Sequence, residues 1–189
     1  MTFEVIKRVF DVLSASILLA ILSPVFLVVG IAVRLDDGGP IFFHQRRVGR
    51  AGCLFTMYKF RSMVVNGPTL SGFSTEPDDF RITRIGRVIR RLSLDELPQL
   101  LNVLKGEMSF VGPRPDLPEQ EGLYLASEWS LRHRVRPGIT GLAQATLRSE
   151  ATPSERKQLD LIYVRSQSLR IDLEILIQTF KQVIVKGGN

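Results

Sequence analysis

An almost unbroken apolar stretch from Val9 to Val33 constrains the fold of this chain more than any other feature of its sequence. As a helix rising about 1.5 Å per residue, these roughly 25 residues would reach about 37 Å, enough to cross a ~30 Å hydrocarbon core with tilt. Apolar side chains around the whole circumference argue against a helix in a soluble core. The length of the run, with no clear small-residue cleavage site after it, argues against a secretory signal peptide. The sequence therefore predicts a membrane segment.

Two features complicate a simple spanning helix. Ser23-Pro24 lies in the middle of the run, where proline removes a backbone hydrogen bond at a cost of about 3 kcal/mol. Cations flank both ends (Lys7, Arg8 and Arg34), and the positive-inside tendency then places both ends on the cytoplasmic side. A helix broken at Ser23-Pro24 would have arms of about 15 and 10 residues that enter one leaflet and return. The residues by themselves leave a spanning and a re-entrant helix both open.

The rest of the chain, residues 35–189, is long enough for one domain with its own hydrophobic core. Two β-rich runs, 41–49 and 54–61, flank a glycine-containing turn, and their pattern predicts a β-hairpin. Apolar stripes at helical spacing predict three helices, over residues 81–92, 93–105 and 169–185. The last of these is amphipathic and suits either a core or a membrane interface. The expected fold class is therefore α/β, predominantly helical, with a small β-hairpin or sheet.

Two adjacent carboxylates, Asp95 and Glu96, follow a run of arginines and precede Pro113-Arg114-Pro115. The net charge of +6 favours an anionic partner such as lipid headgroups, nucleic acid or a phosphorylated substrate. Acids among many cations suggest a site for phosphate and a metal ion. Ser93 and Glu96 also have capping-box spacing, and acids in a first turn stabilise a helix by themselves. The charge pattern alone leaves both interpretations open.

Six blocks of sequence occur in order along the chain. They are Lys59-Phe60-Arg61-Ser62-Met63, Ser93-Leu94-Asp95-Glu96-Leu97-Pro98-Gln99, Asn102-Val103-Leu104-Lys105-Gly106, Gly112-Pro113-Arg114-Pro115, Arg136-Pro137-Gly138-Ile139-Thr140-Gly141, and Leu159-Asp160 with Tyr163-Val164. Together they resemble the bacterial sugar transferase family, the monotopic phosphoglycosyl transferases that start lipid-linked glycan synthesis. The resemblance covers essentially the whole chain, whose length is similar to that of the minimal members.

The resemblance implies an enzyme that transfers a phosphosugar from a UDP-sugar to polyprenyl phosphate, with undecaprenyl phosphate expected, and releases UMP with Mg²⁺. It implies that Asp95 is the nucleophile, which attacks the β-phosphorus and forms a covalent phosphosugar intermediate. Glu96 would assist. Because Mg²⁺ prefers one or two carboxylates together with phosphate oxygens and water, Asp95 and Glu96 are also the candidate metal ligands.

The resemblance also bears on topology. The family's N-terminal Lys-Arg and Ser-Pro pattern, matched by Lys7, Arg8, Ser23 and Pro24, implies a re-entrant membrane helix over residues 1–34, broken at Ser23-Pro24. Residues 35–189 would then form a catalytic domain that rests on the cytoplasmic face of the bacterial inner membrane. The expected partners are the UDP-sugar donor, the polyprenyl phosphate acceptor and membrane lipid, with no nucleic acid; a homodimer is left open.

Six cations are candidate substrate contacts: Lys59, Arg61, Arg90, Arg114, Arg136 and Arg148. Arginine binds phosphate bidentately, and the two prolines that flank Arg114 fix the backbone on both sides of it, which would present its guanidinium rigidly. A structural salt bridge is the alternative for Lys59, Arg61, Arg90 and Arg114. For Arg136 the alternative is a solvated surface position. Arg148 lies in Leu147-Arg148-Ser149, where the family typically carries Gly-Arg-Asn. That departure puts the loop shape and the sugar preference in doubt.

A non-catalytic, membrane-tethered basic module that binds anionic lipid or nucleic acid is the alternative function. It would explain the charge and the apolar segment, but not two adjacent carboxylates between arginines and a Pro-Arg-Pro segment. The sequence also carries no recognisable nucleic-acid motif. Neither the UDP-sugar nor the glycan pathway follows from the sequence.

Overall fold

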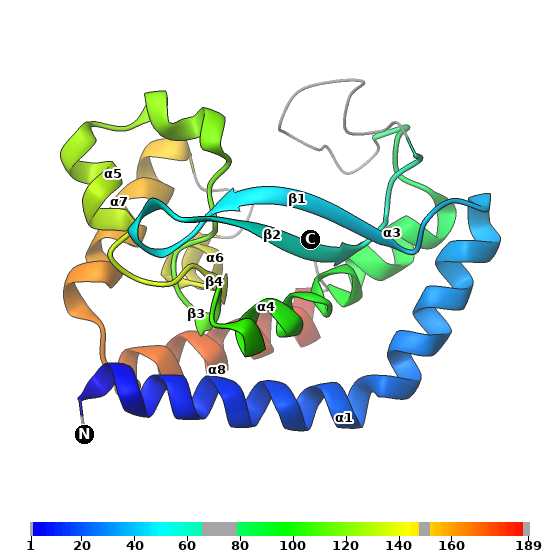
Figure 1. Ribbon diagram of the computed structural model, residues 1–189, viewed down its shortest axis with the longest axis horizontal. Coiled ribbons are helices and arrows are strands. Elements are labelled where there is room, and N and C mark those ends of the chain that lie inside the picture. Colours follow the sequence, from blue (N-terminus) through cyan, green and yellow to red (C-terminus); the bar gives the residue numbers. More distant parts are fainter. Residues whose placement is uncertain (1, 66–78, 148–151, 187–189) are drawn as a thin grey trace.

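Helices dominate this protein, whose computed structural model describes residues 2–65, 79–147 and 152–186. Within these residues there are two small sheets of two strands each (Figure 1). The predicted class, α/β and predominantly helical, is confirmed. The strands are β1 (Phe42–Val48), β2 (Leu54–Phe60), β3 (Ser109–Val111) and β4 (Gly138–Thr140). The α-helices are α1 (Phe3–Asp37), α3 (Arg84–Arg91), α4 (Gln99–Lys105), α5 (Ala126–Arg132), α6 (Leu142–Leu147), α7 (Pro153–Ser166) and α8 (Leu169–Lys186), and 3-10 helices cover Arg50–Gly52, Leu94–Glu96 (η2) and Pro118–Leu123 (η3).

The long helix α1 contains the whole apolar N-terminal segment and bends sharply partway along its length (Figure 1). Among the described helices it alone is long and apolar enough to cross a membrane, judged by length and composition. Pro24 lies inside it and has no N–H to donate to the carbonyl of Ala20, four residues earlier. The Ser23 hydroxyl donates to that carbonyl instead, with Oγ 2.9 Å from the oxygen. Ser23-Pro24 therefore kinks the helix, while the exposed Ala20 carbonyl keeps a hydrogen-bond partner.

The first turns of α1 are held by charged side chains. Lys7 forms an ion pair with Asp172 of α8. The Arg8 guanidinium donates to the carbonyl oxygens of Val103 and Leu104, at 2.6 and 2.8 Å. Both carbonyls lie in the last turn of α4, where backbone acceptors have no partner within the helix and a cation is favourable.

The last turns of α1 contact another part of the same domain. An Asp36 carboxylate oxygen accepts from the backbone N–H of Ile85, in the first turn of α3, at 3.1 Å. Asp37 pairs with the buried guanidinium of Arg61. The apolar side chains of this arm pack with Phe60 of β2 and with α3. Both ends of α1 are therefore fastened to one globular unit.

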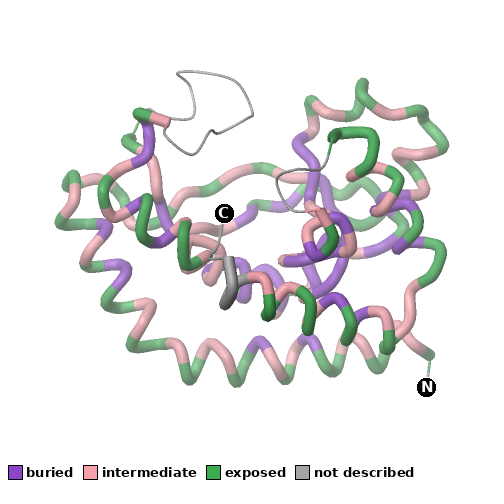
Figure 2. The backbone as a smooth tube through the Cα atoms, turned by 180° about the vertical axis from the view of Figure 1, so that it is seen from behind, coloured by how far each residue is buried: buried purple, intermediate pink, exposed green. Residues whose placement is uncertain are grey.

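The two longer strands form the predicted antiparallel hairpin, with Phe42 of β1 opposite Phe60 of β2. Asn102 of α4 is fully buried and joins the helix to β2. Its Oδ1 accepts from the backbone N–H of Tyr58 at 3.1 Å, and its Nδ2 donates to the carbonyl oxygen of Thr56 at 2.7 Å. Figure 2 shows the buried residues gathered where the hairpin, α4 and the smaller sheet meet, while most of α1 is intermediate or exposed.

In the smaller sheet β3 and β4 pair in parallel, and glycines let their backbones approach closely. A Cβ on Gly112 would lie 2.4 Å from the carbonyl oxygen of Arg136, and one on Gly138 would lie 2.1 Å from the backbone nitrogen of Gly112. Any other residue would clash at these positions. The tight contact fixes the start of the loop that carries Arg114.

Two helix starts differ from expectation. Helix α3 begins at Arg84 and not at 81, because the Thr83 hydroxyl accepts from the N–H of Gly86 at 2.9 Å and caps it. Ser93 adopts a left-handed conformation (φ 55°, ψ 20°), and among the described groups its side chain caps no helix N–H. The capping-box prediction is wrong, because an N-cap residue needs an extended backbone. Helix α4 starts only at Gln99 and ends at Gly106 (φ 82°), as predicted.

Candidate active site

Asp95 and Glu96 lie in η2, the 3-10 turn that joins α3 to α4. Ser93 stands directly before this turn with φ 55°, a left-handed conformation that costs a non-glycine residue about 1–2 kcal/mol. Leu94 and Leu97 pack into the apolar cluster around Phe60 and hold the turn in place. Backbone strain that persists beside two acids is typical of functional sites.

Lys59 and Arg114 converge on Glu96 from two other elements. Lys59 is the next-to-last residue of β2, and its Nζ lies 2.7 Å from Glu96 Oε1. Arg114 follows β3, and one of its terminal nitrogens lies 3.7 Å from the same oxygen. The Glu96 side chain is 17% exposed, so these contacts form in a partly desolvated site where charge attraction is stronger than in water.

Arg90 approaches from the last turn of α3, and its charge acts on Asp95. Helix α3 lies close to the end of β2 because Gly86 has no side chain: a Cβ there would be 2.0 Å from the carbonyl oxygen of Ser62. The N–H of Thr83 donates to that same carbonyl at 3.1 Å. This close packing sets where Arg90 lies relative to the pair of acids Asp95 and Glu96, the dyad.

The two carboxylates have opposite pKa shifts. Burial raises the pKa of Asp95 to about 6; repulsion from Glu96 adds to the rise, and Lys59, Arg90 and Arg114 oppose it. Burial also acts to raise the pKa of Glu96, but the charges of Lys59 and Arg114 outweigh it and leave that pKa at about 2. Both groups are therefore ionised at neutral pH, and Asp95 is the more basic of the two. A basic, poorly paired carboxylate suits attack on phosphorus, and a strongly paired one suits support.

The dyad also fits a magnesium ion. Among the residues that the structure describes, no three His, Cys, Asp or Glu side chains cluster as a metal site. Asp95 and Glu96 offer two adjacent carboxylates, and Glu96 Oε1 already accepts from Lys59. Because Mg²⁺ commonly completes its octahedron with phosphate oxygens and water, this donor set fits an ion that is bound together with a diphosphate.

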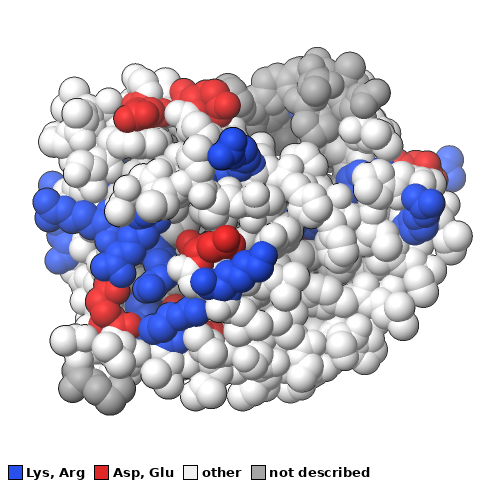
Figure 3. Space-filling view, in the orientation of Figure 1, with Lys and Arg blue, Asp and Glu red and all other residues white. Residues whose placement is uncertain are grey.

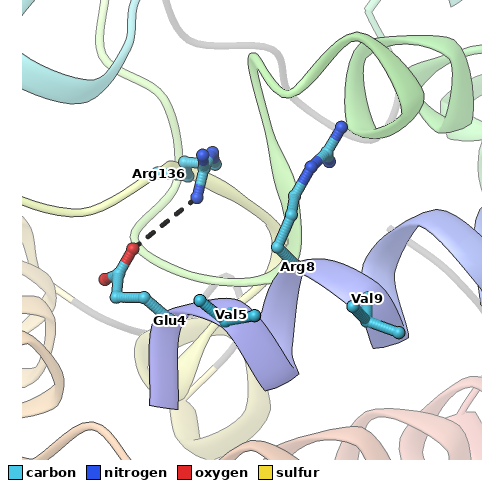
Figure 4. Close-up of a pocket in the computed structure, with 5 residues that line it drawn as sticks. All are labelled: Glu4, Val5, Arg8, Val9 and Arg136. Carbon is cyan, nitrogen blue, oxygen red and sulfur yellow. Dashed lines mark ion pairs between the residues drawn. The ribbon is translucent and has the colours of Figure 1, made fainter. Parts of the chain in front are cut away.

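The remaining candidate contacts lie in other surroundings. Arg61 is buried and pairs with Asp37, which matches its structural salt-bridge alternative. Arg136 donates from Nε to the carbonyl oxygen of Gly106 at 2.9 Å, and a terminal nitrogen lies 3.7 Å from a Glu4 carboxylate oxygen. Figure 4 shows Arg136 facing Glu4 across a pocket beside the first turns of α1. Arg148 lies outside the described residues. The fold thus brings three of the six candidates, Lys59, Arg90 and Arg114, to the dyad.

Sequence reasoning missed a set of charges behind Arg114. Arg132, the last residue of α5, is buried and pairs with Asp116 and Asp160. Arg47 of β1 donates to the carbonyl oxygen of Pro115 at 3.0 Å. Burial lowers the pKa of Arg47 to about 10, and repulsion from Arg114 contributes. Two signals in the sequence pointed to this set: the position of Asp116 directly after the Pro-Arg-Pro segment, and Asp160 in the last of the six blocks.

Comparison with known proteins gives a match along nearly the whole chain. A family model described as "Bacterial sugar transferase" matches residues 2–186. The uncharacterized sugar transferase EpsL of Bacillus subtilis (strain 168) is 45% identical over 184 residues, 97% of this chain and 90% of the relative. A UDP-glucose:undecaprenyl-phosphate glucose-1-phosphate transferase of Klebsiella pneumoniae is 42% identical over 192 residues, 97% of this chain and 41% of the relative. A UDP-N-acetylgalactosamine-undecaprenyl-phosphate N-acetylgalactosaminephosphotransferase of Aeromonas hydrophila is 37% identical over 194 residues, 98% of this chain and 45% of the relative.

Proposed function

This chain belongs to the bacterial sugar transferase family, and from that premise we propose that it transfers a sugar 1-phosphate from a UDP-sugar to polyprenyl phosphate and releases UMP. Undecaprenyl phosphate is the expected acceptor, as in the names of two of the relatives above. The observation that carries the proposal is the dyad: Asp95, a carboxylate with a pKa of about 6, beside Glu96, which Lys59 and Arg114 hold in place.

In the first half-reaction a carboxylate oxygen of Asp95 attacks the β-phosphorus of the donor. The bond from that phosphorus to the bridging oxygen breaks, and UMP leaves with the electron pair. The product on the enzyme is an acyl phosphate that joins Asp95 to the sugar phosphate. An anion can attack an anionic diphosphate only when charge is neutralised and the groups are aligned, which is the role proposed for Lys59, Arg90 and Arg114.

Glu96 supports this step and does not attack. Its contact with Lys59 fixes both side chains beside Asp95, and its low pKa keeps it negative throughout the reaction. Together Asp95 and Glu96 would hold Mg²⁺ against the donor phosphates. A bound Mg²⁺ supplies charge neutralisation and orients the diphosphate for in-line attack.

In the second half-reaction a phosphate oxygen of polyprenyl phosphate attacks the phosphorus held on Asp95. The bond between Asp95 and phosphorus breaks, the carboxylate is restored, and the sugar leaves on the lipid through a diphosphate. Both steps use the same site in turn, so the kinetics are expected to be ping-pong.

The way α1 is held supports a re-entrant topology. Both of its ends contact one domain, whereas a helix that crosses a ~30 Å hydrocarbon core would leave its ends on opposite sides. Exposed apolar side chains recur along α1 (Val9, Leu13, Ile17 and Ile21) and along α8 (Leu169, Leu173, Ile177 and Phe180). Figure 3 shows that the base of the molecule along α1 is mostly uncharged. We place α1 in the cytoplasmic leaflet of the bacterial inner membrane, with the catalytic domain on the cytoplasmic face.

UMP release tests the function directly. The full chain in lipid nanodiscs is incubated with Mg²⁺, undecaprenyl phosphate and a panel of UDP-sugars that begins with UDP-glucose and UDP-N-acetylgalactosamine. We expect UMP with at least one donor, loss of release in EDTA and recovery with Mg²⁺. Asp95→Asn is expected to abolish release, while Glu121→Gln, an exposed acid on η3, serves as the matched control. Full turnover by Asp95→Asn would exclude Asp95 as the nucleophile.

The covalent step has its own measurement. With a donor labelled in the sugar and no acceptor, wild type is expected to retain the label on denatured protein and Asp95→Asn is not. If wild type retained no label without acceptor yet released UMP once undecaprenyl phosphate was added, direct transfer to the acceptor would replace the covalent step. The non-catalytic basic module is disfavoured by family membership, and it would return only if no donor in the panel gave UMP.

A further inference from the structure

Arg114 lies in the segment 113–116, whose four successive carbonyl groups each accept a hydrogen bond from a donor outside the segment. The Pro113 carbonyl accepts from the N–H of Gly138 in β4, and the Asp116 carbonyl accepts from the N–H of Val48 in β1, both at 2.9 Å. Of the two carbonyls between them, that of Arg114 accepts from the buried side chain of Arg132 and that of Pro115 from the half-buried side chain of Arg47. Prolines on both sides of Arg114 fix φ as well.

Among these four contacts, Arg132 makes the one to Arg114 itself. Its two terminal nitrogens donate to the Arg114 carbonyl oxygen at 3.2 and 3.0 Å. The same nitrogens pair with Asp116 and with Asp160 of α7, the latter at 2.6 Å. The Arg132 side chain is 3% exposed, so these bonds form away from water, and each donor left unmatched would cost free energy.

Asp116 and Asp160 in turn hold Arg132 in one orientation. The Tyr124 hydroxyl donates to the second oxygen of Asp116 at 3.1 Å, which leaves the other oxygen for Arg132. The two terminal nitrogens of the guanidinium make four bonds, two to the Arg114 carbonyl and one to each carboxylate. A lysine ammonium has three donors on a single nitrogen and cannot reproduce this fork. The arrangement therefore depends on arginine at position 132 and not merely on a positive charge.

We propose that Arg132 is a positioning residue: it fixes the backbone of Arg114 so that the Arg114 guanidinium stays beside Glu96, where the donor diphosphate binds. The proposal rests on the proposed function for the identity of the ligand. The Arg114 side chain is 36% exposed and reaches Glu96 at 3.7 Å, so its direction is set by the backbone behind it more than by surrounding packing. Arg132 itself is buried behind the segment and touches no substrate.

Arg132→Lys tests the proposal, because it keeps the charge and removes the fork. We expect kcat/KM for the UDP-sugar to fall about tenfold, in keeping with the cost of misplacing a substrate-binding group by a fraction of an ångström. Arg134→Lys, two residues along and exposed, is the matched control and should stay within about twofold of wild type. Thermal unfolding of each variant separates this effect from loss of fold; if Arg132→Lys does not fold, Asp160→Asn, which removes one of its two carboxylate partners, takes its place.

A double-mutant cycle distinguishes positioning from a general structural role. If Arg132 acts through Arg114, Arg132→Lys should change kcat/KM less than about twofold in an Arg114→Ala background. An equal loss in both backgrounds, or no loss in wild type, overturns the proposal. Should wild type release no UMP from any donor, the proposed function fails but this inference is still tested by the ¹⁵N signal of Arg114 Nε. That signal should shift or broaden in Arg132→Lys and not in Arg134→Lys; an unchanged signal in Arg132→Lys overturns it.

Discussion

The ammonium group of Lys59 lies 2.7 Å from Glu96 Oε1, and this contact helps to give the two acids of the dyad different pKa values. Lys59 contacts Glu96 directly, while it acts on Asp95 only through its charge. Glu96 is thus strongly paired and Asp95 is left more basic. Two neighbouring carboxylates with different partners can take different roles in one reaction, one of attack and one of support.

The pKa of Asp95 should respond in opposite directions to two substitutions. Lys59 is the largest charge that lowers this pKa and Glu96 raises it. Lys59→Met should therefore raise the Asp95 pKa above about 6, and Glu96→Gln should lower it. Titration of the Asp95 carboxyl carbon by NMR in metal-free protein measures both, with Asp95→Asn to assign the signal. Lys105→Met is the control, because that ammonium contacts the Tyr58 hydroxyl; an Asp95 pKa that does not move in Lys59→Met contradicts the assignment.

Pro24→Ala should straighten α1. The new residue regains an N–H for the Ala20 carbonyl, which the Ser23 hydroxyl now satisfies. In a Cys53→Ser background, which removes the native exposed thiol, single cysteines at Thr2 and at Pro40 should both react from the cytoplasmic side. With Pro24→Ala, labelling at Pro40 from that side should decrease. If the two positions were labelled from opposite sides of the membrane in the protein that retains Pro24, the helix would span the membrane.

Asn102→Leu should destabilise the fold. The side chain is fully buried, and its loss leaves the N–H of Tyr58 and the carbonyl of Thr56 without partners. At about 1–3 kcal/mol for each unsatisfied buried group, we expect a loss of about 3 kcal/mol, read as a lower midpoint in denaturant or heat. Gln158→Leu, at an exposed position on α7, should stay within about 0.5 kcal/mol. Equal stability of the two variants would contradict a bridging role for Asn102.

Gly86→Ala should reduce activity more than it alters overall structure. A Cβ at Gly86 would lie 2.0 Å from the Ser62 carbonyl oxygen, so α3 must move away and take Arg90 with it. We expect kcat/KM for the donor to fall about tenfold. At Gly122 a Cβ would meet nothing within 4 Å, so Gly122→Ala is the matched control. Unchanged kinetics in Gly86→Ala would show that the position of α3 does not matter to the reaction.

Several features were predictable because their causes lie within a few residues. The hairpin over β1 and β2 follows from alternation around a glycine turn, and Gly106 ends α4 because glycine adopts φ 82° without strain. The prediction failed at Ser93, where the capping-box spacing is present but the backbone is left-handed. Packing of Leu94 and Leu97 into the core overrides the local preference there.

The sequence by itself determined the long apolar N-terminal helix, the fold class and the position of two acids among cations, since composition and periodicity act between near neighbours. Only the tertiary structure decided which cations serve those acids. Lys59 reaches Glu96 from 37 residues away, whereas Arg61, two residues along in the same block, turns to Asp37 instead. Arg132 forms an ion pair with Asp160, which lies 28 residues further along the chain. Cations that are equivalent in sequence become different in the fold, because a charge pairs with whatever partner the packing of distant elements brings within a few ångströms.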